Sequence, residues 1–270
     1  VSCGMCMVNC PFGAIADKSQ IFQLIRAIQS GREVIAEIAP AFVGQFGENV
    51  TPAQVKEGLK QLGFSRVYEV AIGADAGAMA EAKHYVKEVV NGELPFLLTS
   101  CCPSWSMMAR KFFPETIGNI SNELTPMVAT ARKIKEEHPD ASIVFIGPCA
   151  SKKLEASRKK VRSDVDFVLT FEELSGIFDA KNISFDDVPS GGKLQASSAD
   201  GKGFAVSGGV AKAVTNVIKQ MDPDREVKVV SAEGLAECKK MMMLAKAGKY
   251  NGYLLEGMAC PGGCVAGAGT

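Results

Sequence analysis

The chain has 270 residues, and its 30 Lys and Arg are balanced by 30 Asp and Glu, so the formal net charge is zero. Hydrophobic residues make up 47% and charged residues 22%, which is ordinary for a globular protein long enough to bury a sizeable core. The balanced charge argues against a nucleic-acid-binding protein, and no apolar run approaches the roughly 18 residues that a membrane-spanning helix needs.

Strand-like apolar runs alternate with helix-like amphipathic runs along the first half of the chain. The helix that begins at Thr51 has the clearest start signal, because Pro52 suits its first turn and Gln54 completes a capping box. In chain order, we predict a strand at 34–39, this helix, a strand at 66–72, an Ala-rich helix at 75–90, a strand at 96–99, a helix at 126–137 and a strand at 142–146.

The second half continues the same alternation. We predict a strand at 166–170, a helix at 171–179, a polar loop at 181–201, a strand at 203–206, a helix at 208–221, a strand at 227–230, a helix at 233–247 and a strand at 252–256. Such βαβ alternation predicts an α/β fold whose sheets are covered by helices. The polar loop suggests two lobes that divide near residues 155–200.

Nine cysteines define the chemistry of the sequence, at positions 3, 6, 10, 101, 102, 149, 238, 260 and 264. An odd number with close spacings does not resemble a disulfide framework, so we expect free thiols in a reducing compartment, the cytoplasm. With only two histidines in the chain, thiolates are the expected metal ligands, which indicates zinc or iron–sulfur. Cys238 lies at helical spacing from Leu235 and Met242, and we expect it to be a buried apolar thiol.

Cys3, Cys6 and Cys10, followed by Pro11, match the last three cysteines of the bacterial ferredoxin pattern C-x2-C-x2-C-x3-C-P. The first cysteine of that pattern would come immediately before Val1. We therefore expect residues 1–20 to be the trimmed C-terminal part of a ferredoxin-like domain with two [4Fe-4S] clusters. In this pattern Cys3 and Cys6 serve one cluster and Cys10 serves the other. A zinc knuckle or unligated thiols are the alternatives.

Three other cysteine groups each follow a predicted strand directly: 101/102, 149 and 260/264. Functional sites of open α/β sheets form beyond the carboxyl ends of strands. We therefore expect these groups to meet at one site, where four thiolates would suffice for one [4Fe-4S] cube: Cys102, Cys149, Cys260 and Cys264. Cys101 would remain as a thiol beside the cube and Lys152 would supply a positive charge. We expect three glycines to let the backbone approach a bulky cofactor, namely Gly262, Gly263 and Gly267.

The segments TSCCPSW (99–105), GPCASKKLE (147–155) and EGMACPGGC (256–264) resemble the signature motifs of [FeFe]-hydrogenases in order and separation. The resemblance extends over essentially the whole chain, with residues 21–270 as the hydrogenase domain. It implies two lobes of mixed β-sheet flanked by helices, with the cofactor in the cleft between them. That cofactor is the H-cluster, a [4Fe-4S] cube joined to a two-iron subsite that bears CO, cyanide and a bridging azadithiolate.

The resemblance also implies roles for individual residues. The cube ligands correspond to the four cysteines named above, with Cys264 bridging to the two-iron subsite. Cys101 corresponds to the thiol that relays protons, and the proton path continues through Glu81 and Ser121 to His84. Lys152 corresponds to a lysine that bonds a cyanide. Five further positions correspond to residues around the subsite: Pro40, Ala41, Gly147, Phe204 and Met258.

Some positions depart from the family pattern. Gly147 stands where the family usually has Met, Ala41 where it often has Ser, and His84 where it has a second Glu. The last motif ends in GAGT (267–270) instead of three glycines and Gln. Divergent members with such changes include hydrogenases assigned to H2 sensing.

The main hypothesis is therefore reversible H2 oxidation and proton reduction. Electrons would pass through [4Fe-4S] clusters to a ferredoxin or similar carrier, and hydrogenase maturation factors would be further partners. Two alternatives remain, an H2 sensor with low turnover and a cytosolic iron–sulfur assembly factor that lacks the two-iron subsite. The second motif reads much like that of such assembly factors, whereas Cys101 favours a hydrogenase.

Overall fold

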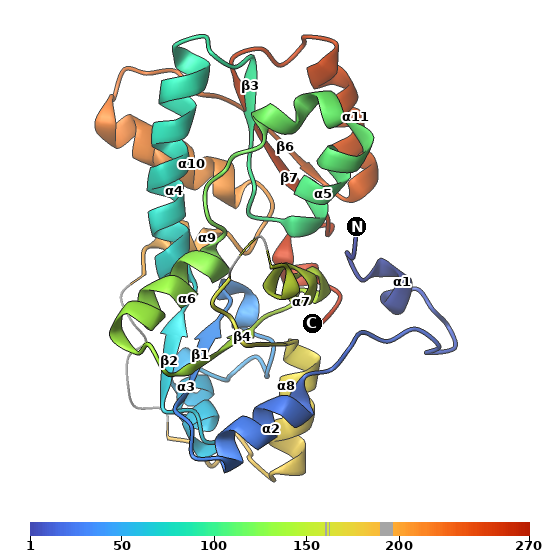
Figure 1. Cartoon of the computed structure of the whole chain (residues 1–270), viewed down its shortest axis with the longest axis vertical. Coiled ribbons are helices and arrows are strands. Elements are labelled where there is room, and N and C mark those ends of the chain that lie inside the picture. Colours follow the sequence, from blue (N-terminus) through green and yellow to red (C-terminus); the bar gives the residue numbers. More distant parts are fainter. Residues whose placement is uncertain (160, 162, 190–196) are drawn as a thin grey trace.

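Two parallel β-sheets, each covered by helices, form the two lobes of the molecule (Figure 1). The computed structural model describes residues 1–159, 161, 163–189 and 197–270. The first sheet has the order β2 (Arg66–Glu69), β1 (Val34–Ile38), β4 (Ser142–Ile146) and β5 (Phe167–Leu169). The second sheet has the order β3 (Phe96–Leu98), β7 (Tyr253–Met258) and β6 (Lys228–Glu233).

The α/β fold with two helix-flanked lobes is confirmed, but the described strand pairs are all parallel and not mixed. Neighbouring strands are joined by helical crossovers, which return the chain in the same direction. Every residue of β1 and β4 is buried, as expected for parallel strands that have helices on both faces.

The helices are α1 (Met5–Val8), α2 (Ile21–Gln29), α3 (Pro52–Gln61), α4 (Ala71–Tyr85), α5 (Pro103–Phe112), α6 (Pro126–Glu137), α7 (Ala150–Ser157), α8 (Phe171–Ala180), α9 (Ala199–Gly203), α10 (Gly209–Met221) and α11 (Leu235–Lys246). Short 3₁₀ turns cover Pro40–Phe42, Pro114–Asn119 and Cys264–Ala266, and a π-helical turn, Val86–Val90, extends α4. The described part of the chain contains no helix of the length and apolar character needed to span a membrane.

The two lobes interleave along the sequence. β3 lies between β2 and β4 in the chain but belongs to the second sheet. The segment 155–200, which we expected to divide the lobes, holds β5 and α8, and both pack in the core of the first lobe. Helix α4 contacts α6 of the first lobe and α10 of the second, so it connects the two lobes (Figure 1).

Several local predictions hold and one is wrong. The Thr51 hydroxyl accepts the Gln54 backbone N–H at 3.3 Å and the Gln54 side chain accepts the Thr51 N–H at 2.9 Å, which completes the capping box. The strand predicted at 203–206 does not form. Instead, α9 runs to Gly203 and a turn follows, because the Ser198 hydroxyl accepts the Gly201 N–H at 2.9 Å and starts a helix. Helices α2, α5 and α7 were not predicted.

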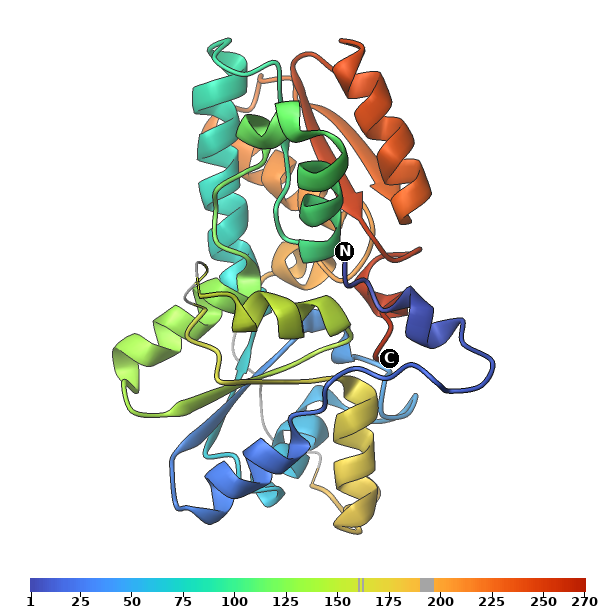
Figure 2. The same ribbon diagram turned by 45° about the vertical axis from the view of Figure 1, so that its right-hand side comes forward.

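An N-terminal arm, residues 1–20, extends along the outside of the domain (Figure 2). Its short helix α1 has no buried residue, and the N-terminus returns to the middle of the molecule near the C-terminus. The ferredoxin-like character of this arm stays a prediction.

Gly257 in β7 allows Trp105 of α5 to pack flat beneath the second sheet. Trp105 is fully buried and donates its indole N–H to the Thr99 carbonyl oxygen at 3.0 Å. A Cβ at position 257 would lie 2.5 Å from Cε2 of the indole ring. The small residue at this position therefore fixes the packing of α5, the helix that begins at Cys102.

We predict that Gly257→Ala lowers the free energy of unfolding by about 1–3 kcal/mol, because overpacking forces Trp105 from its rotamer. Chemical denaturation of the cluster-free protein measures this change. Gly176→Ala is the control, since a Cβ at this exposed position of α8 meets no atom within 4 Å and should stabilise the helix slightly. Equal effects of the two substitutions would contradict the packing argument.

Candidate metal centre

One cavity lies between the lobes, at the carboxyl ends of strands from both sheets. The empty space within it, including open solvent at its mouth, is about 820 Å³. Cys102 follows β3 and caps α5, and Cys149 follows β4 and caps α7. Cys260 follows β7, and Cys264 begins the 3₁₀ turn after it. All four cysteines line the cavity.

The cavity gathers most of the residues singled out in the sequence. Its wall also includes Cys3, Pro40, Ala41, Cys101, Lys152, Phe204 and Met258. Cys6 and Cys10 lie on the arm and do not line it. Cys238 is buried in the core of the second lobe, as expected, and its thiol faces the carbonyl oxygens of Ala232 and Met258.

Burial controls the protonation of the cavity thiols. It raises the pKa of Cys102, and together with nearby Cys149 and Cys102 it raises the pKa of Cys260 to about 12. Burial likewise raises the pKa of Cys264, with neighbouring cysteines adding to the effect. Without a metal these thiols stay protonated at neutral pH. Because the thiolate is the metal-binding form, a cationic iron core would be needed to deprotonate them.

The donor set fits an iron–sulfur cluster better than a single ion. Among the described residues, no three His, Cys, Asp or Glu side chains are close enough together to hold one metal ion. A zinc site needs its thiolates about 2.3 Å from one metal. Here the four cysteines surround a cavity instead, and soft thiolates are the usual ligands of [4Fe-4S] clusters.

Lys152 brings a buried positive charge to the cavity wall. Its Nζ lies 2.6 Å from a carboxylate oxygen of Glu155 and donates to the Cys101 carbonyl oxygen at 3.4 Å. Burial lowers the pKa of Lys152, but Glu155 and the sulfurs of Cys149 and Cys101 outweigh this effect and raise the pKa overall. Lys152 is therefore a cation available to an anionic ligand. The sequence analysis missed Glu155, although its i+3 spacing from Lys152 was a usable signal.

Two glycines of the last motif, Gly263 and Gly267, line the cavity, and both also pack closely against protein. A Cβ on Gly263 would lie 2.6 Å from the Ser207 backbone nitrogen, and one on Gly267 would lie 2.8 Å from Cβ of Pro148. These two glycines let the motif pack against neighbouring protein segments. Gly262 has a φ of +78°, and a Cβ there would meet nothing within 4 Å, so this glycine serves the turn.

Phe145 explains the glycine at position 147. A Cβ on Gly147 would lie 2.6 Å from Cε1 of Phe145 and 2.9 Å from Cβ of Ala39. Phe145 and Ala39 both line the cavity, whereas Gly147 does not. The ring of Phe145 thus occupies the space that a longer side chain at 147 would need. Sequence analysis missed Phe145 because it looked like an ordinary strand residue.

Cys101 lines the cavity, and the buried carboxyl of Glu81 on α4 lies near enough to affect its thiol. Burial raises the pKa of Cys101 well above its usual value, and the nearby carboxyls of Glu81 and Glu256 raise it further. Burial also raises the pKa of Glu81 to about 8, although hydrogen bonds from the Ser121 hydroxyl and the Ser100 backbone N–H counteract it. Both groups are therefore mainly protonated at neutral pH, and Glu81 titrates near the range that suits proton exchange.

Glu123 lies at the outer end of this group and was missed by sequence analysis. Its backbone N–H donates to the Ser121 hydroxyl at 3.3 Å, and its carboxylate is 3.9 Å from Nδ1 of His84. His84 and Glu81 lie one turn apart on α4, so they share a face of that helix. The fold thus brings Glu81, Ser121 and His84 together, with Glu123 as a fourth member. No spacing rule connects positions 84 and 123, so only the fold reveals this neighbour.

We predict a pH-dependent effect of Glu81→Gln on stability. Since the pKa of Glu81 is about 8 in the folded chain and 4.5 ordinarily, the folded state keeps a proton that the unfolded chain loses. The stability contributed by this group is complete below pH 4.5 and declines as the pH rises to 8. Relative to the parent, the free energy of unfolding of Glu81→Gln should therefore rise by up to roughly 1.4 kcal/mol for each pH unit within that window.

Urea unfolding of the cluster-free protein at pH 5 and pH 8.5 measures this difference. Glu136→Gln, at an exposed position of α6, is the matched control and should follow the parent at both pH values. A Glu81→Gln advantage that does not change with pH would exclude a protonated, buried Glu81.

Comparison with known proteins agrees with this geometry. The family described as "Iron only hydrogenase large subunit, C-terminal domain" matches residues 32–268. Iron hydrogenase 1 of Clostridium pasteurianum is 29% identical over 316 residues, covering 96% of this chain and 54% of that protein. The chain thus spans about half the length of the curated hydrogenases that it matches.

A solved structure of an [FeFe]-hydrogenase, HydA(deltaEFG), superposes with a TM-score of 0.76 and 26% identity, covering 94% of this chain and 84% of that one. The relatives are not all hydrogenases: "Cytosolic Fe-S cluster assembly factor NAR1" of Meyerozyma guilliermondii is 29% identical over 134 residues, 45% of this chain and 25% of that protein. With its family match extending over most of its length, the chain belongs to the family of the iron only hydrogenase large subunit, C-terminal domain.

Proposed function

We propose that the chain is the catalytic domain of an [FeFe]-hydrogenase that oxidises H2 and reduces protons at an H-cluster. The observation that carries this proposal is the cavity, where four cysteines from three strand ends are joined by Cys101 and Lys152. Cys102, Cys149, Cys260 and Cys264 would hold the cube, with Cys264 also bridging to the two-iron subsite. That subsite, with its CO, cyanide and azadithiolate ligands, would be inserted by maturation factors in the cytoplasm.

The bound cofactor would supply the redox chemistry that splits H2 or joins protons and electrons. The chain's own residues would orient it and move protons. Lys152 offers an ammonium to an anionic ligand such as cyanide. Four side chains on the remaining wall exclude water: Phe204, Met258, Pro40 and Ala41. Phe145 occupies the space beside Gly147.

Proton transfer is assigned to Cys101 and the groups beyond it. The Cys101 thiol faces the cavity and keeps its proton at neutral pH, so it can donate that proton and then recover another. Glu81 is the nearby titratable group, and it interacts with Ser121. Beyond it, the partly exposed His84 on α4 and Glu123 before α6 lie 3.9 Å apart. This group of residues supports a path for protons from Cys101 toward the surface at His84 and Glu123.

The arm would carry the electrons, by way of [4Fe-4S] clusters ligated through Cys3, Cys6 and Cys10. Backbone N–H groups of Phe12 and Ala14 lower the pKa of Cys10, which favours its thiolate and supports a ligand role. Cys3 lines the cavity and lies near Cys260. A ferredoxin or similar carrier would exchange electrons with this side of the domain.

A second candidate is an iron–sulfur protein without the two-iron subsite, as the similarity to NAR1 suggests. A third is an H2 sensor with low turnover, which the Gly147 and Ala41 departures favour. Cys101 and Glu81 favour the hydrogenase, because a thiol and a nearby buried carboxyl serve proton transfer and have no use in holding a cube.

Infrared spectroscopy after maturation separates these candidates. A hydrogenase or sensor should show CO and cyanide stretches, whereas an assembly factor with only a cube should show neither. Replacing any one of the four cube cysteines by Ala should abolish these bands and the iron content of the cavity, because each substitution removes one of four ligands. Turnover of H2 then distinguishes the enzyme from the sensor.

We predict that Cys101→Ala leaves the infrared bands in place but lowers H2 evolution at least about a hundredfold, because it removes a positioned acid–base group. Turnover is measured with an artificial reductant and normalised to the infrared intensity. Cys238→Ala is the control, since it removes a buried thiol outside the cavity and should keep most of the activity. Full activity of Cys101→Ala would remove this thiol from the proton path.

A further inference from the structure

The N-terminal arm is fixed to the domain at two places, and one of them lies at the cavity wall. At this inner attachment Cys3 lines the cavity wall near Cys260. Gly4 follows with a φ of +84°, and a Cβ there would lie 3.3 Å from Cβ of Ala150 and even closer to Cβ of Ala268. The arm thus fits between the start of α7 and the C-terminal segment, where only glycine leaves enough space.

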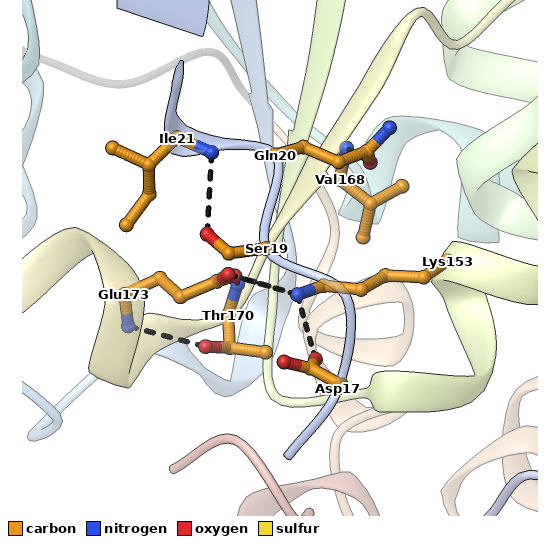
Figure 3. A network of polar contacts seen from close by, with 8 residues as sticks. All are labelled: Asp17, Ser19, Gln20, Ile21, Lys153, Val168, Thr170 and Glu173. Atoms are coloured by element: carbon orange, nitrogen blue, oxygen red, sulfur yellow. Dashed lines mark hydrogen bonds and ion pairs between the residues drawn. The ribbon is translucent and has the colours of Figure 1, made fainter. Parts of the chain in front are cut away.

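The outer attachment is an ionic cluster centred on Lys153. Its Nζ lies 2.6 Å from Oδ2 of Asp17 on the arm and 2.9 Å from both carboxylate oxygens of Glu173 on α8 (Figure 3). The Lys153 side chain is only 11% exposed, so water screens these contacts weakly. Three residues further along, the side-chain oxygen of Gln20 accepts the Val168 backbone N–H at 2.8 Å.

Lys153 is held ready for the arm by α8. The Glu173 carboxylate accepts the Thr170 backbone N–H at 2.8 Å, and the Thr170 hydroxyl accepts the Glu173 N–H at 3.1 Å, which forms the capping box of α8 (Figure 3). Glu173 is therefore fixed by its own helix, and it fixes Lys153 in turn. Asp17 meets an ammonium whose position does not depend on the arm.

Between the two attachments the arm has little else to hold it. Helix α1 buries no residue, and Phe12 is largely exposed. The attachments share α7, since Ala150 contacts the arm near Gly4 and Lys153 holds it at Asp17. The same helix begins at Cys149 and presents Lys152 to the cavity. Helix α7 thus connects the arm to the candidate metal centre.

We propose that Lys153 is a positioning residue that, by pairing with Asp17, holds the arm in place and keeps Cys3 beside Cys260 at the cavity wall. Only one consequence of this inference rests on the proposed function, namely that electrons enter the site from the arm at Cys3. The positioning itself is a property of the chain without its clusters.

Native-state thiol labelling of the cluster-free chain tests the positioning. Loss of one buried charge-assisted contact should raise the labelling rate of Cys3, relative to that of exposed Cys6, by about tenfold in Asp17→Asn and in Lys153→Met. Lys153→Arg should restore the slow rate, because Arg keeps the charge and can reach both carboxylates. Lys111→Met, an exposed lysine on α5, should match the parent.

Asp17→Asn leaves the Lys153–Glu173 pair and the α8 capping box in place, so its thermal unfolding should match that of the parent. This variant separates release of the arm from loss of the fold. An unchanged Cys3 to Cys6 labelling ratio in both Asp17→Asn and Lys153→Met would overturn the proposal.

The loaded protein provides the second readout. Reduction by a ferredoxin should slow several-fold in Asp17→Asn, while reduction by a small viologen, which does not need to dock on the arm, should not change. Equal slowing with both reductants would refute electron entry at Cys3. If Cys3 is released as expected but the protein shows no H2 chemistry, the proposed function fails and the positioning role stands.

Discussion

The convergence of parallel strand ends is the constraint on which the site depends. β4 belongs to the first sheet, β3 and β7 belong to the second, and the carboxyl ends of all three face the same cavity. A cysteine comes within a few residues of the end of each strand, so the chain needs no long loop to bring the thiols together. Burial raises the pKa of Cys102 and of Cys264, so a metal cluster would have to displace the protons of these two thiols.

Sequence patterns predicted the elements that depend on local signals. The buried runs of β1 and β4, the capping box at Thr51 and the helix at 126–137 all follow from spacing and residue type. Patterns failed where tertiary contacts decide the outcome. Residues 203–206 have a strand-like composition, but the Ser198 cap and the packing of α9 against α4 and α10 make this region a helix and a turn.

The candidate metal centre shows the same division between features set by local signals and features set by tertiary contacts. Cysteines placed directly after strands identified the cavity, because the edge where parallel strands end is a general property of the fold. The partners that tune the site could not be predicted, since they come from distant parts of the chain. Glu123 reaches His84 across the lobe, and Glu37, a fully buried carboxyl of β1, lies near the Lys152–Glu155 pair without any hydrogen-bond partner of its own. Burial raises the pKa of Glu37 well above its usual value, so it adds no charge there.

The interleaved order of the strands has a consequence for how the two lobes can fold and evolve. Because β3 is inserted between β2 and β4, no continuous fragment contains one complete sheet without part of the other. Neither lobe can therefore be expressed, exchanged or duplicated as a separate module. A cluster bound by cysteines of both sheets would then act as an inorganic cross-link between lobes that the backbone already entangles.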